Sequence, residues 1–115
     1  MQLRKLGVTE ILVSPIAWGM WRFRGDDLKA ALSRVHAALD AGITLFDTAD
    51  IYGPDNGEPF GAAEALLGRV FQTTPSLRRR MVLATKGGIR PGIPYDSRAE
   101  YLRSAIDASL TRLGT

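Results

Sequence analysis

The chain contains no cysteine, and this absence excludes disulfides, thiolate metal sites and a cysteine nucleophile. Its single histidine, His36, gives no basis for a histidine metal cluster, and we predict no metal site. No run of about 18 apolar residues occurs, and no uninterrupted apolar segment follows the basic residues near the N-terminus. We therefore expect neither a membrane span nor a secretory signal, and the cysteine-free composition is compatible with a cytoplasmic location.

The excess of one sign of charge is small. Fifteen basic residues stand against twelve acidic ones, which gives a formal net charge of +3. The only dense basic run is "LRRR", Leu77–Arg80, which lies before a strand-like segment and is expected to be a solvated loop. A nucleic-acid interface would need a basic stripe interleaved with aromatics along one element, so we expect no nucleic-acid partner.

Apolar residues make up 45% of the 115 residues, enough to bury the core of one domain. Along the chain, strand-like and helix-like periodicities alternate. Residues 3–15 contain two short runs separated by a glycine, which predicts a β-hairpin. After the hairpin, strands are expected at Ile16–Trp21, 43–49 and 80–88.

A helix is predicted after each of these strands, within residues 26–42, 62–71 and 98–114. The third helix begins with an S-x-x-E capping box formed by Ser97 and Glu100. The order indicates an α/β protein: a hairpin followed by three βα units with parallel strands. The predicted inner faces of the helices comprise Leu28, Leu32, Val35 and Leu39, then Ala63, Leu66, Leu67 and Val70, then Leu102, Ile106, Ser109 and Leu113.

Three polar side chains fall near the ends of the predicted strands. The period of two places Asp47 on one face of its strand and Lys86 at the C-terminal end of the next. Because burying either charge alone is costly, we expect the two to pair. Tyr52 follows on the loop above them, and a nearby ammonium favours its phenolate form. Tyr52 is therefore expected to give its proton to a carbonyl oxygen at the strand ends, where α/β folds keep their sites.

The segments that contain these residues resemble the N-terminal part of the aldo-keto reductase family. The matching pieces are "LRKLGVTEILVSPIAWGMW", "GITLFDTADIYG" and "VLATKGG", in the family's order and spacing. The resemblance implies a (β/α)₈ TIM barrel, of which residues 1–115 form an incomplete N-terminal portion. It also implies an oxidoreductase that uses NADPH to reduce an aldehyde or ketone to an alcohol.

Family members use an Asp, Tyr, Lys and His tetrad, and the resemblance assigns the first three roles to Asp47, Tyr52 and Lys86. Tyr52 is then the proton donor, and Lys86 the group that favours loss of its proton. Asp47 orients Lys86 and faces the nicotinamide. The family's histidine lies on a strand beyond this chain, whereas His36 falls within the first predicted helix and is expected to be structural.

The resemblance also places "WGMW" beside the nicotinamide and the substrate. It implicates Gly19, Met20 and Trp21 in cofactor binding, together with Asp47, and it assigns Trp21 and Tyr52 to the substrate pocket. The family more often has threonine where this chain has Met20. No G-x-G-x-x-G or Walker A motif is present, so NADP(H) is implied by the resemblance alone.

Two functions from different classes fit the sequence. The first is the reductase, acting on a small carbonyl substrate with a histidine supplied by residues outside this chain. The second is a non-catalytic fragment or association module that pairs with another copy through an open sheet edge. We expect the 115 residues alone to be inactive, because three βα units cannot close an eight-stranded barrel.

Overall fold

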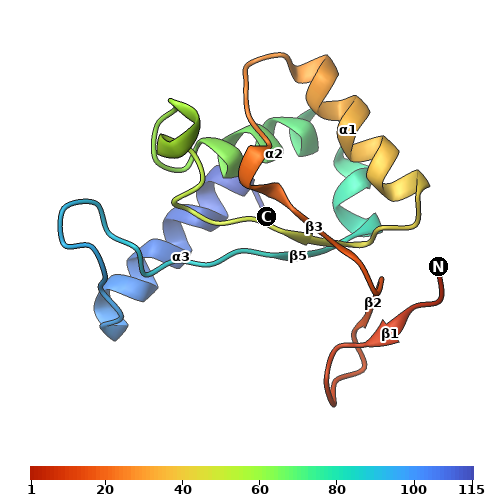
Figure 1. The fold of residues 1–115 in the computed structure, drawn as a ribbon, viewed down its shortest axis with the longest axis horizontal. Helices are drawn as coiled ribbons and strands as arrows, with labels where there is room; N and C mark the ends of the chain where they lie inside the picture. The colour runs from red at the N-terminus through yellow and green to blue at the C-terminus, as the bar shows by residue number, and fades with distance from the viewer.

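A computed structural model describes residues 1–115. The chain begins with an antiparallel hairpin of β1 (Arg4–Lys5) and β2 (Leu12–Val13). A second sheet contains three parallel strands in the order β3-β4-β5: β3 (Ala17–Gly19), β4 (Leu45–Asp47) and β5 (Val82–Ala84). Figure 1 shows the hairpin projecting away from the rest of the chain. Both the hairpin and the parallel sheet agree with the sequence prediction.

A helix follows each parallel strand: α1 (Leu28–Asp40), α2 (Ala62–Thr73) and α3 (Ala99–Leu113). The predicted hairpin followed by three βα units is thus confirmed, and none of the helices has both the length and the apolar character needed to span a membrane. The helix α2 contacts both α1 and α3, so it lies at the centre of the helical layer (Figure 1).

The core lies between the sheet and the helices. Phe46 of β4 is fully buried there, beside Val35 of α1 and Leu67 and Val70 of α2. Trp18 packs edge-to-face against Phe46, with ring centroids 5.4 Å apart. The opposite face of the sheet has no helix against it, and it presents the other residues of the strands, including Asp47. One face therefore stabilises the fold while the other remains open.

The start of α1 follows from its capping residue. Asp27 is the N-cap, and its carboxylate accepts a hydrogen bond from the Ala30 amide at 3.0 Å. After the helix, Gly42 adopts a positive φ of 87°, a conformation that glycine allows without strain. These two residues fix where the helix begins and where the chain turns into β4.

All three parallel strands are shorter than predicted, with Leu45–Asp47 in place of 43–49 and Val82–Ala84 in place of 80–88, and the expected start of α3 differs as well. The strand expected over Ile16–Trp21 ends at Gly19, because Met20–Arg22 forms the 3-10 helix η1, which buries Met20 in the core. The capping box expected at the start of α3 does not form. Arg98 is the N-cap, and its amide donates to Asp96 at 3.1 Å, so a carboxylate earlier in the chain replaces Ser97.

Two further expectations need correction. The basic run lies in a 3-10 helix, η3 (Pro75–Arg80), rather than in a loop, because Leu77 is buried in the core. On α3, Ser109 and Leu113 are buried as predicted, but Ile106 is 58% exposed, since no element packs beyond β5. The inner faces predicted for α1 and α2 are buried or half-buried, and His36 is exposed on α1.

Gly68 sets the distance between α2 and α3. A methyl group at this position would overlap the carbonyl oxygen of Arg112 on α3. Gly68→Ala gains about 1 kcal/mol in helix propensity, but the overlap with backbone must separate the helices. We expect a net loss of about 2 kcal/mol in the free energy of unfolding, measured by urea denaturation.

Gln72→Ala, at an exposed position on the same helix, serves as the control and should change the free energy by less than about 0.5 kcal/mol. Stabilisation by Gly68→Ala would contradict close packing of the two helices.

Candidate active site

Asp47 and Lys86 meet at the C-terminal ends of β4 and β5. The parallel register pairs Leu45 with Val82 and Asp47 with Ala84, so Lys86 lies one step further along the same face. The Lys86 Nζ donates to both carboxylate oxygens of Asp47, at 3.0 and 3.1 Å, and to the Thr48 carbonyl oxygen at 2.9 Å. The predicted ion pair is therefore present, with two charge-assisted hydrogen bonds.

Tyr52 lies beside this pair. The Lys86 Nζ is 4.8 Å from the centroid of the Tyr52 ring. The backbone of Tyr52 is fixed by α2, because the Ala63 amide donates to the Tyr52 carbonyl at 3.0 Å. The structure thus brings together all three residues that the sequence proposed for catalysis. A cavity of about 230 Å³ adjoins them, lined by Ala49, Asp50, Ile51, Tyr52, Lys86, Gly87 and Ile89.

The pKa of Lys86 results from opposing effects. Burial alone would lower this pKa, but the Tyr52 side chain and the Asp47 carboxylate together raise it above its ordinary value of 10.5. The ammonium is therefore a fixed positive charge at neutral pH. Because the fold raises this pKa, the contact contributes stability below about pH 10.5, which is lost as the pH rises through the folded-state value. The side chains of Lys86 and Asp47 are 50% and 43% exposed, so this contribution is small.

The three residues predicted to lie beside a nicotinamide, Gly19–Trp21, have different environments in the structure. Gly19 lies in register with Asp47, and no heavy atom lies within 4 Å of where a Cβ would stand. The side chain of Met20 is instead buried in the core. Trp21 is exposed, and its carbonyl accepts a hydrogen bond at 2.6 Å from Asn56, on the loop that follows Tyr52.

Two buried carboxyl groups behind the site were missed by the sequence interpretation. Asp50 is buried, and neither of its carboxylate oxygens has a hydrogen-bond partner in the protein. Glu64 is fully buried, accepts from the Ser109 hydroxyl at 3.1 Å and lies 3.6 Å from the Arg112 guanidinium. Burial raises the pKa of both carboxyls, and the Arg112 charge offsets this only in part.

Asp50 connects the end of β5, which carries Lys86, to α2. Its amide donates to the Lys86 carbonyl at 3.1 Å, and its own carbonyl accepts from the Gly61 amide at 2.7 Å. Its carboxylate lies so close to Gly87 that an added Cβ there would stand 2.9 Å from Oδ2. Glu64 had a detectable signal, because it begins an i, i+3, i+4, i+7 stripe of buried residues, completed by Leu67, Gly68 and Phe71.

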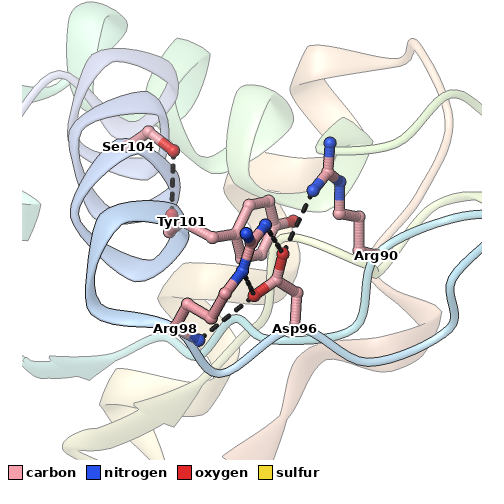
Figure 2. Close-up of polar contacts among 5 residues, drawn as sticks. All are labelled: Arg90, Asp96, Arg98, Tyr101 and Ser104. Atoms are coloured by element: carbon pink, nitrogen blue, oxygen red, sulfur yellow. Dashed lines mark hydrogen bonds and ion pairs between the residues drawn. The ribbon is translucent and has the colours of Figure 1, made fainter.

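A third buried carboxylate, Asp96, lies in the segment between Lys86 and α3 (Figure 2). Arg98 binds both of its oxygens, at 3.0 and 2.7 Å, and Arg90 binds one at 3.1 Å. The guanidinium of Arg90 also stacks over the Tyr101 ring, 5.1 Å from its centroid. Hydrogen bonding from Arg98 holds the pKa of Asp96 well below its ordinary value, so this carboxylate stays ionised at neutral pH.

Asp47→Asn tests the charge coupling within the site. The change removes the negative charge that raises the pKa of Lys86, so the titration midpoint of the lysine should fall. The measurement is an NMR titration of the Lys86 ¹³Cε resonance in the 115-residue chain. Asp107→Asn, at an exposed position of α3, should leave the midpoint where it is. An unchanged midpoint in Asp47→Asn would contradict the coupling.

Known proteins resemble this chain over almost its whole length. The sequence profile described as "Aldo/keto reductase family" matches residues 15–115. A "6-dehydroglucose reductase" of Novosphingobium aromaticivorans is 62% identical over 112 residues, covering 96% of this chain and 37% of that protein. A protein of the same name from Agrobacterium fabrum is 35% identical, covering 90% of this chain and 37% of its own length.

A solved structure from Pseudomonas aeruginosa, assigned to the aldo-keto reductases, superimposes with a TM-score of 0.80 and 31% identity. It covers 98% of this chain and 42% of its own. The chain therefore spans about two fifths or less of the proteins it matches, and its fold corresponds to the N-terminal hairpin and first βα units of their barrel. Since the profile covers most of the sequence, the chain belongs to the aldo/keto reductase family.

Proposed function

We propose that residues 1–115 supply the Asp, Tyr and Lys of the active site of an NADPH-dependent reductase that converts a sugar aldehyde into an alcohol. The observation that supports this most directly is the Lys86 ammonium, bound by Asp47 at 3.0 Å and lying 4.8 Å from the centroid of the Tyr52 ring. The substrate class is suggested by the names of two relatives, both called 6-dehydroglucose reductase. The histidine of the family's tetrad, in this proposal, comes from residues outside this chain.

The open face of the sheet fits the nicotinamide of the cofactor. Gly19 and Asp47 lie side by side at the strand ends, and the space over Gly19 is free of other heavy atoms. A flat ring can approach the backbone there because no side chain stands in the way. In this proposal the ring is held by Gly19, Asp47 and the exposed Trp21, and the main chain of Met20 contributes to the same binding surface. When bound, NADPH supplies the hydride that adds to the carbonyl carbon.

The proton in this mechanism comes from Tyr52. Its hydroxyl gives a proton to the carbonyl oxygen of the substrate, which completes the alcohol, and a phenolate remains on the tyrosine. The positive charge of Lys86 stabilises that phenolate, and Asp47 keeps the ammonium in place through two hydrogen bonds. The cavity beside Tyr52 and Lys86 is the space for the substrate.

Tyr52→Phe tests the proposed proton donor in the full-length protein that contains this segment. Loss of the hydroxyl should lower carbonyl-dependent oxidation of NADPH by about 10²-fold or more, with NADPH binding retained, because general acid catalysis contributes at least this much. Tyr101→Phe removes the same atom from a ring stacked beneath Arg90 and should keep the wild-type rate. A full rate in Tyr52→Phe would exclude Tyr52 as the donor.

Self-association is a second candidate function, supported by what the sheet and α3 leave uncovered. The strands β3 and β5 each pair on one side only, so each presents an unpaired edge. Ile106 and Leu110 of α3, 58% and 44% exposed, place apolar surface next to the β5 side of the sheet. A second copy of the chain pairing at this edge would cover both features.

Ile106→Lys tests this second candidate. If copies pair along β5 and α3, the mass of the 115-residue chain should rise with concentration, and a charge at Ile106 should abolish that rise. Sedimentation equilibrium measures the mass directly. Ser104→Lys adds the same charge at another exposed position of α3 and should leave the association intact. A monomeric mass at every concentration would exclude self-association.

A further inference from the structure

The segment after Lys86 returns on itself as a short hairpin, residues 88–96. The Asp96 amide donates to the Gly88 carbonyl at 2.8 Å, and the Arg90 amide donates to the Pro94 carbonyl at 2.6 Å. Between these bonds, Ile89 pairs with Tyr95 in an antiparallel bridge. The segment is therefore an ordered extension of the β5 end, directly beside the candidate catalytic residues.

Asp96 holds this hairpin to the start of α3. Its carboxylate is nearly inaccessible to solvent and binds Arg90 from within the hairpin and Arg98 from the helix N-terminus (Figure 2). Arg90 is in turn stacked on Tyr101 of the same helix. A bidentate arginine–carboxylate pair has a fixed geometry, so these contacts preorganise the hairpin relative to the helix.

One face of the hairpin is directed toward the site. Ile89 lines the same cavity as Tyr52 and Lys86. Directly opposed residues of an antiparallel pair present their side chains on the same face, so Tyr95 lies beside Ile89 on that face. Tyr95 is nevertheless 72% exposed, compared with 43% for Trp21, and Ile89 is also exposed. An apolar pair held in a fixed position next to a catalytic cavity, yet uncovered, has the properties of a ligand-contact surface.

We propose that Ile89 and Tyr95 form the wall that contacts the sugar ring of the substrate and that Asp96 is the residue that positions this wall. The inference rests on the proposed function and specifies its substrate recognition. A sugar ring presents C–H groups on its faces and hydroxyls on its edge. A tyrosine offers an apolar ring face and a hydroxyl, and Ile89 adds apolar surface toward Tyr52, where the reacting carbonyl would lie.

A binding experiment tests the wall independently of catalysis. Glucose, the alcohol form of 6-dehydroglucose, is titrated at millimolar concentrations into the 115-residue chain, and the Ile89 methyl and Tyr95 ring resonances are followed by NMR. Both should shift. Tyr95→Phe should retain the shift at Ile89, Tyr95→Ala should lose it, and Ile93→Ala, an exposed apolar residue of the same hairpin, should behave as wild type. Absence of shifts at Ile89 and Tyr95, or equal loss in Ile93→Ala, would overturn the proposal.

A kinetic experiment in the full-length protein tests the specificity. Tyr95→Ala should raise KM for 6-dehydroglucose about five-fold with kcat nearly unchanged, because it removes an aromatic contact remote from the reacting atoms. Reduction of glycolaldehyde, which has no ring, should be unaffected, and Tyr95→Phe should restore KM for the sugar. Asp96→Asn should raise the same KM, since it loosens the hairpin that carries Ile89 and Tyr95.

Different results would exclude the reductase activity and the Ile89–Tyr95 wall. If glucose shifts Ile89 and Tyr95 but the full-length protein oxidises no NADPH with either carbonyl compound, the wall is supported and the reductase is excluded. If both compounds are reduced but Tyr95→Ala leaves KM for 6-dehydroglucose unchanged, the wall is excluded and the reductase is supported.

Discussion

The register between β4 and β5 is the constraint on which the site depends. Asp47 lies opposite Ala84, so that Lys86, two residues further along, shares its face and reaches its carboxylate. A slip of one residue would turn Lys86 to the face occupied by Phe46, where a charge has no partner. The register is in turn set by Phe46, which is buried against the helices and admits only one alternation of side chains. Packing on one face thus determines the chemistry on the other.

A second layer of polar groups lies between the sheet and the helices, and it ties the site to α2 and α3. Asp50 joins the Lys86 backbone to Gly61 at the start of α2, and Glu64 and Arg112 connect α2 with α3. Burial raises the pKa of both acids, and the positive charge of Arg112 offsets this only in part. Burying these charged groups costs free energy unless they pair with one another. Pairing requires α2 and α3 to approach closely, and Gly68 permits that approach. Gly68 at the α2–α3 contact therefore supports a polar cluster that fixes the strand end carrying Lys86.

The sequence predicted the elements whose cause is local and missed those whose cause is tertiary. Periodicity located the helices, and the alternation along each strand was enough to predict the Asp47–Lys86 pair. Ser97 had a suitable capping spacing, but Asp96, already held by Arg90 and Arg98, bonds the Arg98 amide instead. Asp50 was not recognised, because no local pattern distinguishes a buried carboxyl from a turn former. Ile106 fitted the helical stripe, yet its burial requires a neighbour beyond β5, which periodicity cannot supply.

Solvent exposure decides how strongly the site residues act on one another. The side chains of Asp47 and Lys86 remain about half exposed on the open face of the sheet, where water screens their charges. The same distances in a water-excluded site would give a much stronger effect of Lys86 on the phenolate of Tyr52, because electrostatic energies rise as the effective dielectric constant falls. Groups that cover this face, such as the nicotinamide proposed to lie over Gly19 and Asp47, would therefore strengthen the charge stabilisation of the Tyr52 phenolate. In the proposed reductase, cofactor binding would thus be coupled to catalysis through the exclusion of water from one face of one sheet.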